Sequence, residues 1–564
     1  MDTQRIILFF VFGFSLLMLW DAWEKEHRPK PVAQVAQTAQ SAVPSSPAPA
    51  PAAKPGAQPE SAAATAPKAT DGSVPGAAAA AAKGEIIVVR TDLVAAEIDT
   101  LGGTLRKLEL LRHKEVKGSD KSLVLLGPDH LYEAQSGLTG DSGLNHRTLW
   151  TAKPGVHVLA DGQDTVEVRL TAQGKDGLSA TKIYRFRRDS YLIDVVLEIS
   201  NGGPAAVSPA TYFQFTHDGK HAGDSNTIAQ TFGAQSFNGF AVYTEEKKFQ
   251  KVQSSDLDKS KADYVKQSND GWLAYVQHYF VAGWIPPAKA ERSYEVLKRD
   301  DGVYAGYVRL PVGSIAPGAT ASVSVPLYAG PQEQRRLATV APGFDLVVDY
   351  GWLTVIAWPL FWLLEKFHDL AGNWGVAIIL LTMLIKLVFY PLSAAQYKSM
   401  AKMKLVTPRV QKIREMYEHD RQKMNQAMME LYKTEKINPL GGCFPIVVQI
   451  PVFIALYWVL LAAIELRHAP FMLWIQDLSA LDPYYVLPIL MTITMVIQTR
   501  LNPTPPDPVQ AKVMQFMPFI FSIFFFFFPA GLVLYWLVNN VLSILQQWQN
   551  QRMFDRDKPA HAKR

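Results

Sequence analysis

An apolar segment with one lysine inside it sets the strongest constraint on how this chain can fold. Residues 374–393 read WGVAIILLTMLIKLVFYPLS, and about twenty such residues in a helix cross a bilayer core of roughly 30 Å. Lys386 lies too deep to reach either surface easily, and a charge there costs roughly 2.5–3.5 kcal/mol. Because no other predicted span offers an acidic partner, we expect Lys386 to face water inside the membrane. A tolerated surface lysine is the alternative.

Charge and cysteine content exclude some protein classes. The 564 residues suffice for two or three domains, and 56 basic residues stand against 51 acidic ones, a net charge of +5. So mild a balance does not indicate a protein that binds DNA. Cys443 is the single cysteine, which excludes an internal disulfide.

The N-terminal part predicts a membrane anchor on a long tether. After a short cytoplasmic tail (1–5), residues 6–23 are apolar. Where a cleaved signal peptide would have small residues, the sequence has Trp20, Asp21 and Trp23. We therefore expect an uncleaved anchor, with cleavage as the alternative. Residues 24–83, rich in Ala and Pro, predict a disordered linker.

Residues 84–340 predict an extramembrane, all-β sandwich domain. Alternation of apolar and polar residues appears in TVEVRLTA (165–172) and YRFRR (184–188). Further β-rich runs occupy 191–201, 211–216 and 322–330, and Gly, Pro, Asn and Asp separate these runs. The stretch 330–340 is the one place where we expect a helix.

Residues 343–372 predict an amphipathic helix in the outer membrane interface. Apolar residues recur at helical spacing, and Trp352, Trp358 and Trp362 supply interfacial anchors. If this segment crossed the membrane, the basic loop that follows the next span would fall outside the cell. We therefore expect it to lie on the membrane, and residues 374–395 to form the second span.

The loop 396–440 predicts a cytoplasmic helical hairpin. From 398 to 440 it carries ten Lys or Arg against five acidic residues, and the positive-inside rule places such a loop in the cytoplasm. Four further spans complete a six-span α-helical membrane bundle, at 441–464, 484–500, 513–528 and 531–549. Loop 465–483 is then periplasmic, whereas loop 501–512 and the basic tail 550–564 are cytoplasmic.

Several polar residues share the predicted spans with Lys386. Thr382 lies four residues earlier on the same helix face, and Gln449 lies in the third span. The sixth span adds Tyr535, Asn539, Asn540 and Ser543. Polar groups in lipid need partners, so these residues form either a shared groove with Lys386 or hydrogen bonds between helices.

Other motifs carry weaker signals. Methionines in the hairpin, among them Met424, Met428 and Met429, form either an adaptable surface for apolar partners or ordinary packing. Gly140-Asp141-Ser142-Gly143 resembles a protease nucleophile region, but no matching His and Asp motif precedes it. His217, His221 and His278 lack metal-site spacing, and no phosphate-binding loop of the G-x-x-x-x-G-K-[ST] type is present. We expect no catalytic residue, metal or cofactor.

The second half resembles the YidC family of bacterial inner-membrane insertases. The resemblance rests on these stretches: 373–375, FYPLSAAQYKSMAKM (389–403), INPLGGCFPIVVQIPVFIALYWVL (437–460), 465–491 and FPAGLVLYWLVNN (528–540). The β domain is similar to the large periplasmic domain of the Gram-negative members, for example at GWLAYVQHYFVAGWIP (271–286). The resemblance implies a sugar-mutarotase-like β-supersandwich without sugar chemistry, and five of the six spans as the insertase core.

The resemblance also implies a site and partners. The family has a hydrophilic groove with one positive residue, usually arginine, which corresponds here to Lys386, so the charge is kept but the bidentate fork is lost. The other groove positions correspond to Thr382, Gln449 and Trp536, and Tyr535 lies beside them. Implied partners are nascent inner-membrane proteins, the ribosome, the Sec translocon, the signal-recognition-particle receptor and the lipid bilayer.

Two other functions stay open on the residues alone. A small-solute or proton-coupled transporter also places a charge in mid-membrane, but it usually shows internal repeats and further ionisable groups in its spans. A membrane-anchored periplasmic receptor or carbohydrate enzyme would use the β domain, but it would not need five further spans with a polar face.

Overall fold

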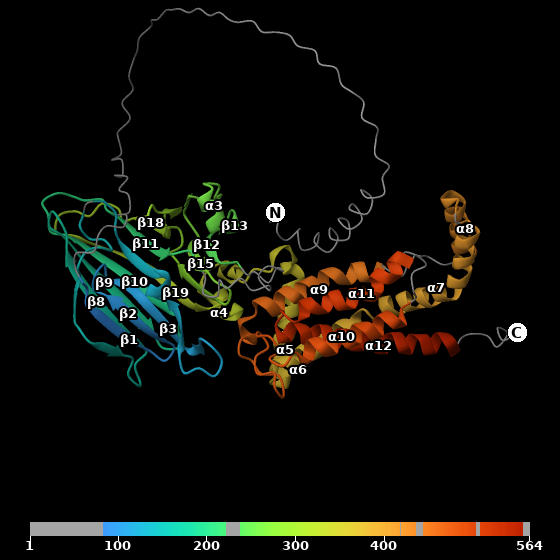
Figure 1. Cartoon of the computed structure of the whole chain (residues 1–564). Helices are drawn as coiled ribbons and strands as arrows, with labels where there is room; N and C mark the ends of the chain where they lie inside the picture. Colours follow the sequence, from blue (N-terminus) through green and yellow to red (C-terminus); the bar gives the residue numbers. More distant parts are fainter. Residues whose placement is uncertain are drawn as a thin grey trace, which may run out of the picture. The chain divides into compact units, whose positions relative to one another are not determined.

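The computed structural model describes residues 83–140, 142–220, 237–417, 419–435, 444–502 and 508–556. The predicted anchor, nearly all of the predicted linker and the end of the predicted tail lie outside the described residues. Within them, a β domain is followed by a helical region (Figure 1).

The β domain consists of two sheets, which confirms the predicted sandwich. The first sheet has ten strands, in spatial order β14 (Gln267–Ser268), β17 (Arg292–Lys298), β18 (Tyr304–Pro311), β11 (Ala210–His217), β5 (Glu133–Leu138), β3 (Thr104–Lys114), β2 (Val94–Asp99), β1 (Ile86–Arg90) and β7 (Val156–Val158), with β4 (Ser122–Leu126) paired to β3. The second has nine, in the order β13 (Lys248–Val252), β12 (Gly239–Thr244), β15 (Trp272–Val276), β16 (Phe280–Trp284), β19 (Thr320–Pro331), β10 (Leu192–Asn201), β9 (Leu178–Arg187), β8 (Thr165–Gln173) and β6 (Thr151–Ala152).

Alternating side chains bury one face of each sheet. In β8, Val168, Leu170 and Ala172 are buried while the residues between them are exposed, as the period of two predicts. The indole of Trp284 in the second sheet lies 5.2 Å from the ring of Phe213 in the first. Large aromatic side chains from both sheets therefore fill the space between them.

Several short helical segments lie between the strands or between the longer helices. They are α3 (Ser254–Asp258), α4 (Gln334–Val340) and the 3-10 turns η1 (Pro128–His130), η2 (Phe344–Val347), η3 (Gly351–Leu353) and η5 (Ile464–Leu466). Helix α4 falls within the stretch 330–340 where the sequence predicts a helix.

Helices α5 (Thr354–Ala371) and α6 (Trp374–Val388) form a tight hairpin. Gly372 ends α5 in the left-handed conformation, with φ at 64°, which glycine adopts without a steric penalty. Asn373 then caps α6, because its side chain accepts a hydrogen bond from the amide of Val376 at 3.1 Å. These two caps turn α6 back against α5, and α5 also contacts α9.

The predicted second span, 374–395, is not one straight helix. Helix α6 ends at Val388, and α7 (Tyr390–Met416) continues at an angle of 64°. Pro391 lies in the first turn of α7, where its missing amide is tolerated, but the same ring opposes continuation of the helix before it. A break near Phe389 follows from this residue, and the sequence interpretation overlooked it.

Helix α8 (Arg421–Thr434) runs back along α7. The side chain of Asp420 caps its start by accepting from the amides of Gln422 and Lys423. Arg409 in α7 forms an ion pair with Glu435, just past the end of α8. Since the start of α8 follows the end of α7 closely, this ion pair makes the two helices antiparallel.

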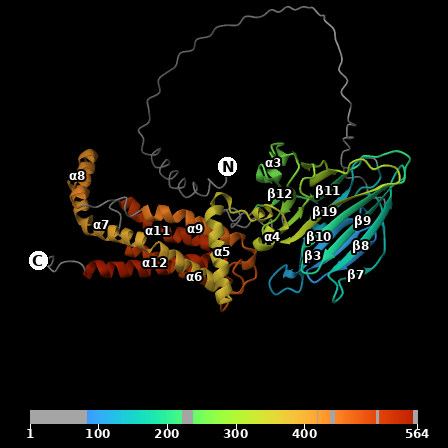
Figure 2. The ribbon, with the colours of Figure 1, turned by 180° about the vertical axis from the view of Figure 1, so that it is seen from behind.

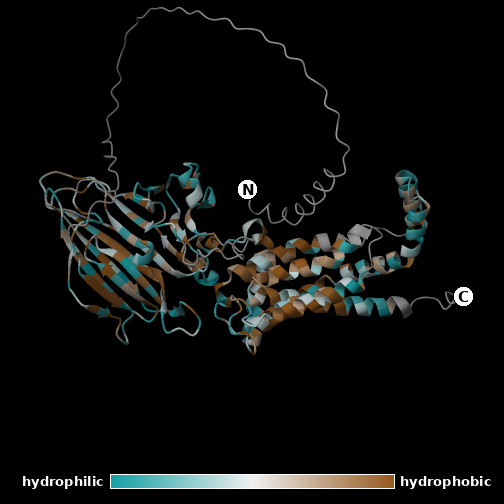
Figure 3. Ribbon diagram, in the orientation of Figure 1, coloured by the Kyte–Doolittle hydropathy of each residue, from teal (hydrophilic) through white to brown (hydrophobic). Residues whose placement is uncertain are grey.

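Four more helices complete the helical region: α9 (Phe444–Ala462), α10 (Val486–Leu501), α11 (Pro508–Phe525) and α12 (Ala530–Arg556). Helix α12 contacts α6, α7, α9 and α10, and Figure 2 shows it beside α6. Figure 3 shows α9 and α11 largely hydrophobic and α8 largely hydrophilic. Helix α12 continues to Arg556, beyond the predicted span 531–549.

Candidate functional site

Lys386 lies near the end of α6 and points at α12. Its side chain is 7% exposed, and its Nζ donates a hydrogen bond to Ser543 Oγ at 2.7 Å. Ser543 in turn donates to the carbonyl oxygen of Asn539 at 2.7 Å. Among the described residues, no carboxylate lies within ion-pair distance of this ammonium group. Two residues of the predicted polar set, Lys386 and Ser543, are therefore in direct contact. The charge of Lys386 has no compensating carboxylate among the described residues.

Two further polar groups surround this contact. The side chain of Gln546 donates to the carbonyl oxygen of Lys386 at 3.4 Å, and the hydroxyl of Tyr397 donates to the carbonyl oxygen of Ser543 at 3.2 Å. Neither residue stands out in the sequence. Gln546 follows Ser543 by three positions and so shares its helix face, whereas Tyr397 reaches α12 because α7 bends away from α6.

Thr382 shares the buried face of α6 with Lys386. It is 1% exposed, and its hydroxyl donates to the carbonyl oxygen of Ile378 in the same helix at 2.7 Å. A Cβ at Gly531 would lie 3.6 Å from Ile378, and Lys386 contacts Ser543 further along α12. Helices α6 and α12 therefore run parallel, and Thr382 lies between these two contact points.

Tyr535, Trp536 and Gln449 gather at a different place, where α12 meets α9. The rings of Tyr535 and Trp536 lie 5.7 and 4.2 Å from the ring of Phe453. Gln449 is half-buried and precedes Phe453 by one helical turn, on the same face. The predicted groove residues thus form two clusters on α12, one around Lys386 and one around Phe453.

The methionines of the hairpin differ in exposure. Met424 and Met428 are half-buried, while Met429 is 56% exposed. All three lie in α8, which is polar on average. Both sequence interpretations, packing and an adaptable surface, stay open for them.

Helix α5 has one buried and one exposed apolar face. Leu360, Phe361 and Leu364 are buried, whereas Trp358 and Trp362 are 58% and 46% exposed. An apolar face that includes tryptophans and stays exposed among the described residues is typical of a helix at a membrane surface.

The expected absence of a metal site and of a protease motif can be examined only in the described residues. No cluster of three His, Cys, Asp or Glu within the described ranges has the geometry of a metal site. Asp141 of the protease-like motif, His221 and Cys443 lie outside the described residues. Across the described segments, no single helix is both long and apolar enough to cross a membrane, although α6 and α7 meet that criterion as a bent pair.

Comparison with known proteins decides the family. Residues 86–363 match the family described as YidC periplasmic domain, and residues 366–558 match the 60Kd inner membrane protein family. A membrane protein insertase YidC from Nitrosospira multiformis is 53% identical over 561 residues, which cover 98% of each chain. The chain belongs to the YidC family. Another family member, from Methylobacillus flagellatus, is 52% identical over 99% of this chain and 98% of its own.

One solved structure of the YidC family is also similar. It is an active insertase with its first transmembrane domain resolved, at 18% identity and a TM-score of 0.36, covering 84% of this chain and 95% of that one. The assignment to the YidC family rests on the matched family descriptions and the relatives above, because these are similar in sequence along nearly the whole chain.

Proposed function

We propose that this membrane protein insertase moves polar segments of its clients past the cluster of Lys386, Ser543, Gln546 and Tyr397. The relatives that match along the whole chain are named membrane protein insertases, and a transporter finds no support among them. The main observation in support of this site is the hydrogen bond from Lys386 to Ser543. It joins α6 to α12 through a cation that has no carboxylate nearby among the described residues.

The proposed mechanism is physical rather than chemical. Water beside Lys386 shortens the apolar path that a polar segment must cross, and the ammonium group attracts acidic residues of that segment. The client's apolar segment then leaves the groove for the bilayer, and its burial supplies the driving force, about 25 cal/mol per Å². The client passes along α6, α9 and α12, on a path lined by Thr382, Gln449, Tyr535 and Trp536. No cofactor is needed.

The proposed topology places this path in the inner membrane. Six spans have both termini in the cytoplasm, the β domain in the periplasm and the hairpin of α7 and α8 in the cytoplasm. Helix α5 lies in the outer interface, with Trp358 and Trp362 toward the lipid, and the exposed apolar face of α5 supports this placement.

The proposed partners come from the resemblance to the YidC family, and the topology sets the side of the membrane on which each one acts. Nascent inner-membrane proteins are the clients, and the ribosome and the signal-recognition-particle receptor meet the cytoplasmic side, where Met424, Met428 and Met429 offer contacts. The Sec translocon acts beside the helical region for clients that need both.

Substitution at Lys386 tests the mechanism. Lys386→Arg should keep insertion of a client with an acidic translocated tail, whereas Lys386→Ala and Lys386→Glu should impair it, and clients with neutral tails should suffer less. The measurement is protease protection of both kinds of client in vesicles that contain each variant. Full insertion of the acidic-tailed client by Lys386→Ala, at equal protein levels, would refute the electrostatic mechanism.

A further inference from the structure

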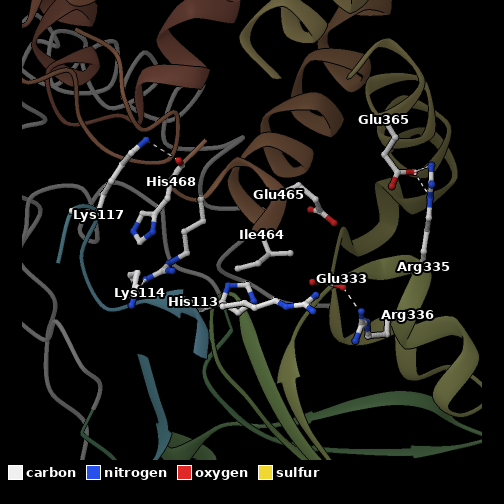
Figure 4. A pocket seen from close by; sticks show the side chains of 13 residues that line it. His113, Lys114, Lys117, Glu333, Arg335, Arg336, Glu365, Ile464, Glu465 and His468 are labelled. Atoms are coloured by element: carbon white, nitrogen blue, oxygen red, sulfur yellow. Dashed lines mark hydrogen bonds and ion pairs between the residues drawn. The ribbon is translucent and has the colours of Figure 1, made fainter. Parts of the chain in front are cut away.

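A cavity of about 780 Å³ lies where the β domain meets the segment after α9 (Figure 4). Its walls come from the end of β3, the start of α4, helix α5 and the turn η5. Charged side chains line it, and six are basic against three acidic: Arg112, Lys114, Lys117, Arg335, Arg336 and Arg467 against Glu333, Glu365 and Glu465.

Three of the six cations have carboxylate partners. Arg335 lies 3.0 Å from Glu365, and Arg336 lies 3.1 Å from Glu333; both pairs are drawn in Figure 4. Arg112 lies 3.7 Å from Asp92 and 3.5 Å from Asp189. These ion pairs compensate the charge on one side of the cavity.

The other three cations have no carboxylate within ion-pair distance among the described residues, and each donates to backbone carbonyl groups. The guanidinium group of Arg467 also lies 5.5 Å from the centre of the Phe280 ring. Lys114 Nζ donates to Asp120 O at 3.0 Å, and Lys117 Nζ donates to His468 O at 2.8 Å. Arg467 Nη2 donates to the carbonyl oxygens of Lys114 and Glu115, at 2.7 and 3.1 Å. Carbonyl dipoles orient these side chains without neutralising them, so Lys114, Lys117 and Arg467 form a cationic end of the cavity.

Two titratable neighbours, Glu465 and His113, also line the cavity. Burial raises the pKa of Glu465 to about 8, so at neutral pH this carboxyl group is mostly protonated and repels an anion little. Burial lowers the pKa of His113 to about 4, so at neutral pH its ring is uncharged and the positive charge comes from the lysine and arginine side chains. At neutral pH the cationic end therefore keeps its excess of positive charge.

We propose that this cavity binds a phosphate group at Lys114, Lys117 and Arg467. Three cationic donors from two separate segments suit a tetrahedral anion with several acceptor oxygens better than a planar carboxylate, and charge-assisted hydrogen bonds of this kind are the strong ones. The volume is that of a typical small-ligand site.

The phosphate comes either from a phospholipid headgroup or from free phosphate in solution. Glu365, which lines the cavity, belongs to α5, the helix that the proposed topology places at the outer headgroup level. The lipid source therefore rests on the proposed function, whereas the binding of phosphate itself does not.

Binding to the purified full-length protein tests the proposal. One arm measures retention of phosphatidylglycerol by native mass spectrometry in neutral detergent, and the other measures inorganic phosphate by equilibrium dialysis. Lys114→Gln combined with Lys117→Gln should weaken binding about tenfold or more in the arm that carries the true ligand. The control combines Lys153→Gln with Lys175→Gln, two exposed lysines of the β domain outside the cavity lining, and should bind like the unaltered protein.

Each outcome of this experiment either supports or overturns the proposed phosphate site. Loss in the lipid arm alone assigns a headgroup site, and loss in the phosphate arm assigns a site for soluble phosphate. Unchanged binding in both arms, or an equal loss in the control, would overturn the proposal. Lys386→Ala should leave both arms unchanged, which separates a failure of this site from a failure of the proposed insertion mechanism.

Discussion

Two buried lysines, Lys182 and Lys386, satisfy their ammonium groups with neutral oxygen atoms. Lys386 donates to one hydroxyl on α12. Lys182, in the core of the β domain, donates to the carbonyl oxygens of Gly102, Gly103 and Ser136 at 2.7, 3.1 and 2.9 Å, and its Nζ lies 4.9 Å from the centre of the Trp150 ring. Burial lowers the pKa of Lys182 to about 7. Lys182 thus serves the fold of the β domain by donating to buried carbonyl groups, of which that of Gly103 also accepts from the hydroxyl of Tyr184 at 2.7 Å.

Lys182→Met should destabilise the β domain by about 2–4 kcal/mol, because it removes a charged donor from three buried carbonyl groups. The measurement is hydrogen exchange of strands β3 and β9 in the full-length protein. Lys107→Met is the control, since Lys107 forms partly exposed ion pairs with Glu97 and Glu109, and such pairs contribute about 0–1 kcal/mol. Equal protection in the two variants would contradict the role of Lys182.

His146 should make the β domain sensitive to acid. Burial lowers its pKa to about 4, below the value of about 6.5 for an exposed histidine, and its Nδ1 lies 2.6 Å from the hydroxyl of Tyr212. Between pH 6.5 and 4 the unfolded chain binds a proton that the folded domain does not, so the free energy of unfolding falls as pH falls.

The loss from His146 should reach up to about 2 kcal/mol at pH 5 relative to pH 7.5. Denaturant unfolding of the full-length protein at the two pH values measures it, and His146→Gln should show a smaller difference between them. The same pH dependence in the variant and the unaltered protein would show that other groups cause it.

At the scale of elements, the bend between α6 and α7 decides which helices can meet. It carries α7 toward α12, so that Tyr397 reaches the backbone of Ser543 beside Lys386. Pro391 lies at the start of α7 and withholds the amide that would continue the helix from α6. Pro408 lies inside the same helix without ending it, so the presence of a proline alone does not decide where a helix ends.

Pro391→Ala should straighten the bend, because it restores the missing amide donor. Spin labels at Met383→Cys and Met416→Cys, in a background with Cys443→Ser, should move apart by roughly 5 Å, given a rise of about 1.5 Å per residue. Both labelled positions are exposed. Pro408→Ala is the comparison variant, and it should change the distance less than Pro391→Ala, because α7 continues through Pro408 as one helix. An unchanged distance in Pro391→Ala would mean that packing against α12, rather than the proline, holds the bend.

At the scale of the whole molecule, the described β domain and helical region are joined by direct contacts. Arg467 donates to the backbone after β3, and the ring of His278 lies within 2.9 Å of the carbonyl oxygen of Leu461 near the end of α9. The end of α9 therefore lies on the same side of the membrane as the β domain in the proposed topology, and the hairpin of α7 and α8 lies on the other.

Cysteine labelling should confirm this arrangement. In the Cys443→Ser background, an impermeant thiol reagent added to intact spheroplasts should label Lys153→Cys in the β domain but not Met416→Cys in the hairpin, because the charge of loop 396–440 keeps it in the cytoplasm. Both positions are exposed, and lysis should allow labelling of both. Labelling of Met416→Cys before lysis would refute the topology.

Local patterns were enough to predict the two-sheet domain and the helical region. Alternation in stretches such as 165–172 depends only on which face of a strand is buried, and long apolar runs depend only on the helix rise and the bilayer thickness. The family was also within reach of the sequence, because its stretches are continuous. The number of spans stays a prediction.

Local sequence patterns could not predict the contacts between segments that are far apart in the chain. Lys386 and Ser543 are 157 positions apart, and the sequence indicated only that polar groups in the spans need partners. The cationic end of the cavity joins Lys114 and Lys117 to Arg467, about 350 positions further on. No periodic pattern in the sequence predicts this contact, because the contact results from the packing of the β domain on the end of α9. The local sequence thus determined the secondary-structure elements. Only long-range packing determined which charged side chains lie together and which of them have carboxylate partners.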